Sequence, residues 1–130
     1  MNIGLGARRK TVLLVDSDPH ARATLRTALE AAGFSVGEAA NGREGERTVT
    51  RIQPDAILAD LLIETVDAGS TIAEKLKAIG ARIPIYIVSS AADALVGAVG
   101  LDELGVSGVF LKPADPAIVI QTLKTRLAVN

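Results

Sequence analysis

The sequence predicts an α/β protein: a doubly wound parallel sheet of five strands, with a helix after each strand. Short apolar runs recur along the chain, and segments with apolar residues at helical spacing lie between them. The runs do not alternate apolar with polar residues, which is typical of strands buried on both faces of a parallel sheet. The connections are short, which favours strands of one sheet. The crossovers between such parallel strands should be right-handed.

The first strand is expected at residues 11–15, and a helix follows it directly. Asp18 followed by Pro19 starts this helix, because an Asp cap satisfies free backbone amides and Pro presets the φ angle. Gly33 ends the helix, since glycine readily adopts the backbone conformation found after a helix. Residues 34–36 then form a short second strand.

The middle of the chain continues the same alternation. Asn41 caps a second helix. Residues 56–60 form the third strand, which ends on a carboxylate. Residues 61–69 form a loop, and a third helix starts at Asp67 or Ser70.

The last two units follow the pattern again. Pro84 introduces a fourth strand at residues 85–88. Residues 91–104 are expected to form a helix that internal glycines weaken. A fifth strand covers residues 106–111, and the Asp-Pro pair at 115–116 opens the last helix.

Composition limits the classes of function. The 130 residues suit one domain, long enough to bury roughly two-thirds of the surface that its unfolded chain exposes. A formal net charge of -1 gives no general reason to expect contact with nucleic acid or an acidic membrane. The absence of cysteine excludes disulfides and thiolate chemistry. No stretch approaches the length of a membrane span, and we expect a cytoplasmic protein with a flexible tail at residues 1–9 and one domain at 10–128.

Polar residues stand at the ends of four predicted strands. Asp16 follows the first strand and Asp60 ends the third, while Ser89 and Lys112 follow the fourth and fifth. The strand order 2-1-3-4-5 of flavodoxin-like sheets would place Asp16 beside Asp60 at a topological switch point, where open α/β sheets bind ligands. Spacing alone does not prove this order, but it is the arrangement in which the acids can act together.

This set of side chains favours phosphoryl-transfer chemistry. Neighbouring carboxylates repel each other, and a hard cation such as Mg²⁺ relieves the repulsion because it selects oxygen ligands. The metal ion and the lysine would neutralise phosphoryl oxygens, and the hydroxyl would donate a hydrogen bond. One Asp would then attack as the nucleophile.

Four segments together resemble the receiver domain of two-component response regulators, over residues 10–128. The segments are Val15-Asp16-Ser17-Asp18-Pro19, Pro54 to Asp60, Pro84 to Ser90 and Gly105 to Pro113. Each is weak alone, whereas four in register at these intervals are specific. The resemblance implies that Asp60 accepts a phosphoryl group from a histidine kinase or phosphotransfer protein, that Ser89 hydrogen-bonds it and that Lys112 pairs with it. It also implies a cis peptide between Lys112 and Pro113.

The resemblance further implies a metal site and protein partners. Mg²⁺ would be bound by Asp16, Asp60 and the backbone carbonyl of Leu62. Ser17 or Asp18 would be a further ligand. The protein would signal to a downstream protein partner, as a monomer or a homodimer, without contacting nucleic acid or membrane itself. It would not be an enzyme, beyond removing its own phosphoryl group.

Three positions depart from the family pattern. Ser17 stands where the family usually has a second adjacent acid that ligates the metal, which should weaken Mg²⁺ binding. Val109 replaces the usual switching Tyr or Phe with a short, stiff β-branched side chain. Glu64 replaces a common Pro and adds a charge to the loop that follows the acceptor.

Two other functions are compatible with the sequence. A pseudo-receiver would share the fold and bind partners without phosphorylation, and Ser17 and Val109 favour it. A phosphatase resembling the haloacid dehalogenases would use Asp16-Ser17-Asp18 as nucleophile and general acid/base, with Ser89 and Lys112 in its second and third motifs. The sequence has no strand left for that family's later acidic pair and no cap domain, so the receiver function is preferred.

Overall fold

The computed structural model describes residues 9–60, 82–90 and 106–129, which include a five-stranded parallel sheet. Its strand order is β2-β1-β3-β4-β5, and this confirms the predicted order. The strands are β1 (Thr11–Val15), β2 (Ser35–Ala39), β3 (Ala56–Ala59), β4 (Ile85–Ser89) and β5 (Gly108–Leu111). Because β1 lies between β2 and β3, the carboxyl ends of β1 and β3 are neighbours.

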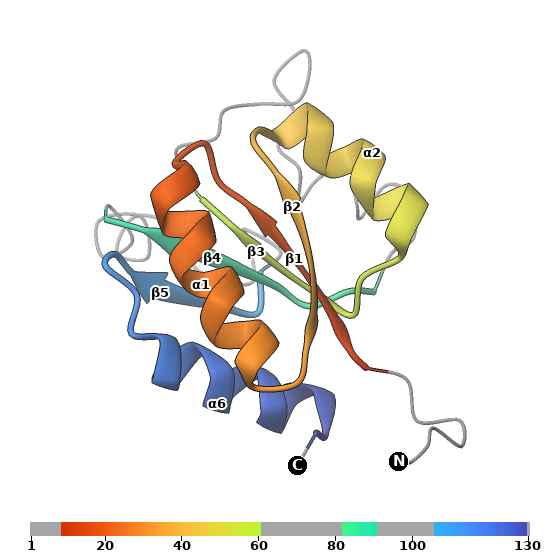
Figure 1. Ribbon diagram of the computed structural model, residues 1–130. Coiled ribbons are helices and arrows are strands. Elements are labelled where there is room, and N and C mark those ends of the chain that lie inside the picture. The colour runs from red at the N-terminus through yellow and green to blue at the C-terminus, as the bar shows by residue number, and fades with distance from the viewer. Residues whose placement is uncertain (1–8, 61–81, 91–105, 130) are drawn as a thin grey trace.

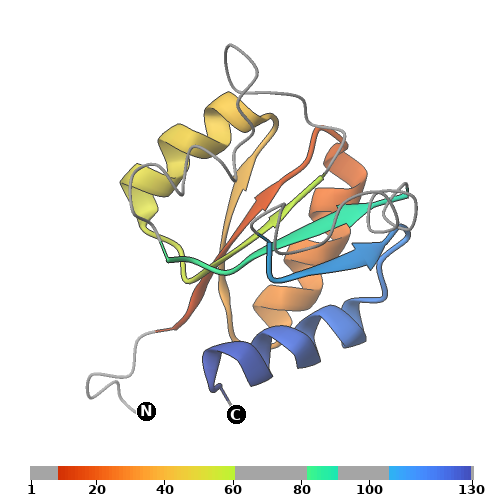
Figure 2. The same ribbon diagram turned by 180° about the vertical axis from the view of Figure 1, so that it is seen from behind.

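Helices cover both faces of the sheet (Figure 1, and Figure 2 from behind). The helices α1 (Pro19–Ala31) and α6 (Pro116–Leu127) pack on one face, and α2 (Gly42–Ile52) packs on the other. The helices predicted within 67–81 and 91–104, the loop at 61–69 and the tail up to residue 8 lie outside the described residues. Within the described part of the chain, no helix is long and apolar enough to cross a membrane.

The strand β1, which lies between β2 and β3, contributes to apolar layers on both faces of the sheet. Successive side chains of a strand point to opposite faces. Val12 and Leu14 pack in the layer under α1 and α6, whereas Leu13 and Val15 pack in the layer under α2. All four are at most 2% exposed. A strand buried in this way cannot shift by one residue without exchanging its two faces, so its register fixes Asp16 at its end.

Only β1 has the predicted range: β3 ends at Ala59, one residue before its predicted end, β4 ends at Ser89, one residue after it, and β2 and β5 differ by more. β2 continues to Ala39 rather than ending at Val36, because it pairs with β1 in parallel along its whole length. β5 begins at Gly108 rather than at Val106. A Cβ atom at Gly108 would lie 3.1 Å from the ring of Tyr86 on β4, so this ring packs against Gly108 where β5 begins.

Each described helix begins at the polar cap that the sequence predicts. Asp18 caps α1 by accepting a hydrogen bond at 2.9 Å from the backbone N–H two residues on, and Asp115 caps α6 in the same way. At α2, Oδ1 of Asn41 accepts from the N–H of Glu44 at 2.8 Å. Oε1 of Glu44 in turn accepts from the N–H of Ala40 at 3.2 Å. The two bonds together hold the start of α2 against the residue before its cap.

The substitution Asn41→Ala should lower the free energy of unfolding by about 1 kcal/mol, because an amide in the first turn of α2 loses its acceptor. Urea denaturation followed by circular dichroism measures this quantity. Thr50→Ala is the control, since Thr50 is exposed on the same helix. Equal losses in the two variants would contradict the capping role.

Candidate functional site

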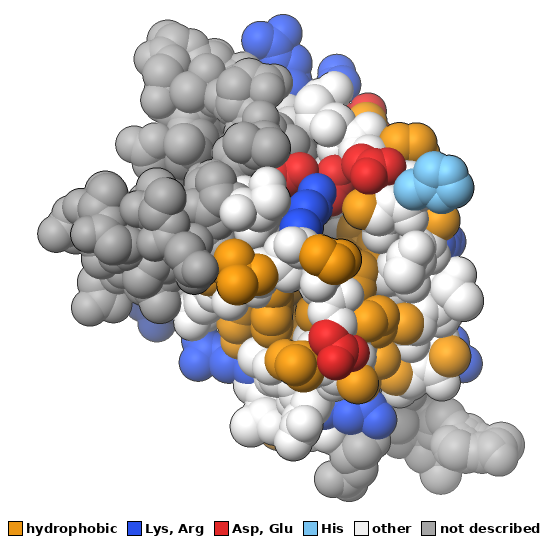
Figure 3. Space-filling model, turned by 90° about the vertical axis from the view of Figure 1, so that its left-hand side faces the viewer, with side chains coloured by type: hydrophobic (Ala, Val, Ile, Leu, Met, Phe, Trp, Pro, Cys, Tyr) orange, Lys and Arg blue, Asp and Glu red, His pale blue; other side chains and the backbone are white. Residues whose placement is uncertain are grey.

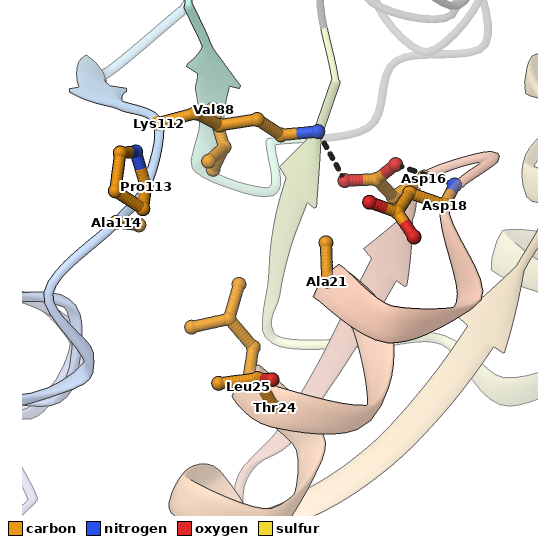
Figure 4. A pocket seen from close by; sticks show the side chains of 9 residues that line it. All are labelled: Asp16, Asp18, Ala21, Thr24, Leu25, Val88, Lys112, Pro113 and Ala114. Carbon is orange, nitrogen blue, oxygen red and sulfur yellow. Dashed lines mark hydrogen bonds and ion pairs between the residues drawn. The ribbon is translucent and has the colours of Figure 1, made fainter.

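Three charged side chains meet at the carboxyl edge of the sheet. Asp16 follows β1 and Asp60 follows β3, and these strands pair side by side up to Val15 and Ala59. Nζ of Lys112 lies 2.8 Å from Oδ2 of Asp16 and 2.8 Å from Oδ2 of Asp60. Figure 4 shows the contact with Asp16. The structure therefore brings together three of the residues that the sequence places at this edge.

Both carboxylates are largely withdrawn from water. Asp16 is 8% exposed and Asp60 is 7% exposed. An ionised carboxylate in such surroundings is strongly disfavoured unless it is paired and hydrogen-bonded. Lys112 supplies the pairing cation from the end of β5, and its own side chain is 24% exposed.

Lys112 is charged at neutral pH. Burial lowers the pKa of Lys112, but hydrogen bonds to Asp16 and to Asp60 outweigh this effect and hold the pKa above its ordinary value of 10.5. The ammonium group is thus a fixed positive charge between two acids.

Backbone groups hold Asp16 in position. Its N–H donates to the carbonyl of Ala39 at 3.0 Å, which extends the β1–β2 ladder by one bond. Its Oδ1 accepts from the N–H of Asp18 at 2.8 Å. The carboxylate of Asp18 caps α1, and Ser17 is exposed between the two acids. One carboxylate oxygen of Asp16 is therefore turned toward its own loop and the other toward Lys112.

The remaining residues that the sequence singles out lie on β4, on or next to β5, or outside the described residues. Ser89 ends β4 and is fully buried, and its carbonyl accepts from the N–H of Lys112 at 3.3 Å. The Lys112–Pro113 peptide bond is cis, as the resemblance implies. Val109 is half-buried in β5. Leu62, the predicted carbonyl ligand, lies outside the described residues.

The donors present fit a hard cation, although with fewer charges than the family pattern. Asp16 and Asp60 present carboxylate oxygens at one edge, and Mg²⁺ selects such donors. Ser17 offers a neutral hydroxyl, and Asp18 is engaged as a helix cap. Within the described part of the chain, no group of three or more His, Cys, Asp or Glu side chains is placed to hold a metal ion. The described residues thus offer a metal two carboxylates that already share an ammonium.

A cavity of about 330 Å³ adjoins the cluster, between the start of α1 and the turn from β5 to α6 (Figure 4). Figure 3 shows acidic and basic side chains gathered above hydrophobic ones on this face. The lining residues are Asp16, Asp18, Ala21, Thr24, Leu25, Val88, Lys112, Pro113 and Ala114. Small and apolar side chains form most of the wall, and the charged groups form one part of it.

Sequence reasoning missed an arginine–glutamate group behind Asp16. Arg22 on α1 donates from Nη1 to the carbonyl of Asp16 and from Nε to Oε1 of Glu38 at 2.9 Å. Arg26 pairs with the other oxygen of Glu38, and its Nε lies 3.3 Å from Oε2 of Glu30. The available signal was the four-residue spacing of the two arginines and Glu30, which is equally typical of any exposed helix face.

Comparison with known proteins decides the family. The model of the response regulator receiver domain matches residues 12–124, which is most of the chain. The chain belongs to the response regulator receiver family. This confirms the resemblance that the four sequence segments carry, and the five-stranded parallel sheet agrees with it.

Individual relatives agree with the family. The receiver is 31% identical over 127 residues to the transcriptional regulatory protein PrrA of Mycobacterium leprae, a match that covers 98% of this chain and 53% of PrrA. It is 43% identical over 88 residues to a gliding motility regulatory protein of Myxococcus xanthus, covering 66% of this chain and 11% of that protein. A crystal structure of a LuxR-family two-component response regulator from Aurantimonas is 27% identical, with a TM-score of 0.74 and coverage of 93% and 86%. The receiver thus spans about half the length of PrrA.

Receiver domains accept a phosphoryl group in two-component signal transduction, and the fold and paired acids of this receiver fit that function. Domains of this family generally bind Mg²⁺ at the phosphorylation site and are generally not enzymes. Response regulators act with histidine kinases and downstream partners. Of the three functions compatible with the sequence, the comparisons support the receiver.

The substitution Lys112→Met should raise the affinity for Mg²⁺ about tenfold, because the metal no longer competes with an ammonium for the same carboxylate oxygens. Isothermal titration calorimetry measures the affinity. Lys10→Met is the control, since Lys10 is exposed at the amino end of β1, at the opposite edge of the sheet. Unchanged affinity in Lys112→Met would show that the metal binds without displacing the ammonium.

Proposed function

We propose that this receiver is phosphorylated on Asp60 by a histidine kinase or a phosphotransfer protein. The observation that carries the proposal is the position of Asp60. It is a carboxylate only 7% exposed, directly after the central strand β3, with Oδ2 2.8 Å from the ammonium of Lys112. Asp16 has one oxygen on the N–H of Asp18 and the other on Lys112, which suits a supporting role.

In the proposed transfer, a carboxylate oxygen of Asp60 attacks the phosphorus atom of a phosphohistidine. The bond between phosphorus and the imidazole nitrogen breaks, and the imidazole leaves with the electron pair. Lys112 stabilises the negative charge of the phosphoryl oxygens, because it is a cation already in place before the reaction. Ser89 is proposed to donate a hydrogen bond from its hydroxyl to the transferred group, since it lies at the end of the neighbouring strand.

Asp16, Asp60 and the carbonyl of Leu62 are the groups proposed to hold Mg²⁺. The bound ion would supply positive charge against the phosphoryl oxygens. Ser17 leaves the site one carboxylate short of the family pattern, so we propose weak metal binding, with Ser17 or Asp18 completing the ligands.

We further propose that the receiver domain comprises residues 10–128, with residues 1–9 outside it. The receiver acts in the cytoplasm on a downstream protein, as a monomer or a homodimer. Its near-neutral formal charge of -1 supports a protein partner over direct contact with nucleic acid or membrane. We propose no enzymatic activity beyond hydrolysis of its own acyl phosphate.

Incubation with Mg²⁺ and acetyl phosphate should add one base-labile phosphoryl group to the wild-type receiver. Asp60→Asn should abolish the addition, because an amide lacks the nucleophilic oxygen. Intact mass spectrometry before and after mild base measures the group.

Asp115→Asn is the matched control for this experiment. It makes the same chemical change at a helix cap, where asparagine serves as well as aspartate. Phosphorylation of Asp60→Asn at the wild-type rate would refute the assignment. A wild-type protein that stays unmodified would favour an interaction module that works without phosphorylation.

The substitution Ser17→Asp should tighten Mg²⁺ binding about tenfold, since a carboxylate replaces a neutral group beside Asp16 and attracts the cation. Ser107→Asp adds the same charge at an exposed position at the start of β5, on the opposite edge of the sheet, and should leave the affinity unchanged. Calorimetric titration of both variants compares them. Equal affinities for Ser17→Asp and the wild type would indicate that another oxygen already fills this ligand position.

A further inference from the structure

We propose that Arg22 is a positioning residue for Asp16, and that it ties the turn carrying this acid to helix α1 and strand β2. Its part in phosphorylation rests on the proposed function of Asp60. Arg22 acts through the backbone of Asp16, so it belongs to the support of the site rather than to the reacting groups.

The first contact is with the main chain of Asp16. Val15 pairs with Ala39 as the last residue pair of the β1–β2 ladder, and the carbonyl of Asp16 lies just beyond it. Nη1 of Arg22 donates to this carbonyl. Backbone carbonyls past the end of a ladder need such a partner when they are covered by the fold. Arg22 thus binds the turn where the regular strand bonding stops.

The second contact anchors the same guanidinium to the sheet. Nε of Arg22 donates to Oε1 of Glu38 at 2.9 Å, and Glu38 lies in β2 opposite Leu14 of β1. Arg26 holds the other oxygen of Glu38. Hydrogen bonds from Arg26 and from Arg22 lower the pKa of Glu38 below its ordinary value of 4.5, so this carboxylate is charged at neutral pH. Glu38 is therefore an ionised acceptor for both arginines at neutral pH.

Together these bonds restrain Asp16 on every side. Its N–H is held by Ala39, its carbonyl by Arg22, and its carboxylate oxygens by Asp18 and Lys112. The planar guanidinium can serve two acceptors in fixed directions, which a lysine ammonium on a flexible stem does not reproduce. The side chain of Arg22 is 18% exposed, against 41% for Arg26, as expected of a group that reaches inward from α1.

Arg22→Gln and Arg26→Gln form a matched pair for the test. Both shorten an arginine of α1 and remove a hydrogen bond to Glu38, but only Arg22→Gln removes the donor to the Asp16 carbonyl. Three quantities are compared in the full chain. They are the free energy of unfolding in urea, the chemical shift of the Asp18 amide proton without Mg²⁺, and the initial rate of phosphorylation by acetyl phosphate with Mg²⁺.

Arg22→Gln should move the Asp18 amide proton upfield, because its hydrogen bond to Oδ1 of Asp16 loosens. It should also slow phosphorylation roughly tenfold to a hundredfold, the scale on which small misplacements of a positioned group act. Arg26→Gln should leave the phosphorylation rate within about twofold of the wild type, since exposed ion pairs contribute little to stability. Arg22→Lys keeps the charge without the planar guanidinium, so its Asp18 amide shift and its phosphorylation rate should lie between those of the wild type and Arg22→Gln. This variant provides the test if Arg22→Gln does not fold.

Equal changes of the amide shift and the rate in Arg22→Gln and Arg26→Gln would overturn the positioning role. Full recovery of both readouts in Arg22→Lys would also overturn it, because the effect would then come from charge alone. A wild-type chain that is not phosphorylated would refute the phosphoacceptor function instead. The Asp18 amide shift would then still decide the role of Arg22, because it is measured without phosphorylation.

Discussion

The ammonium of Lys112 between two buried carboxylates is the interaction on which the rest of the site depends. The pairing of β1 with β3 brings Asp16 and Asp60 together, and the strands cannot separate them without breaking the central ladder. The acids would repel each other in these surroundings. Lys112, at the end of β5, relieves this repulsion. The contact therefore requires β4 to pair with β3 and β5 to pair with β4. The charge balance of the site is thus a property of the whole sheet.

This pairing also defines the resting state of the receiver. With Ser17 between Asp16 and Asp18, the described residues give the ammonium two acids to neutralise. A site with a further carboxylate would keep a larger negative charge and a stronger pull on a divalent cation. A metal ion or a phosphoryl group at the proposed site would therefore encounter an acid pair that Lys112 already partly neutralises. Its binding would require Lys112 and the two acids to exchange partners.

Much of the fold and the centre of the site could be predicted from the sequence, because strand ends are strongly determined. The apolar run before Asp60 does not alternate, so the strand is buried on both faces and its last residue is fixed in space. The extent of β2 was missed because Gly37 and Glu38 interrupt its apolar pattern. Arg22 was missed for a different reason. Its role depends on where its side chain points, from α1 toward Asp16 and Glu38. In the sequence of a helix, an arginine that reaches inward cannot be distinguished from one that faces water.

The cavity beside α1 has a consequence for the strength of the central ion pair. Small residues such as Ala21 and Ala114 leave about 330 Å³ next to Lys112, with enough polar groups in the wall to bind water. Water that enters this cavity would raise the effective dielectric constant around the ammonium and weaken its attraction to Asp16 and Asp60 compared with a dry interior. The small side chains of this wall thus leave the central cation open to solvent on one side.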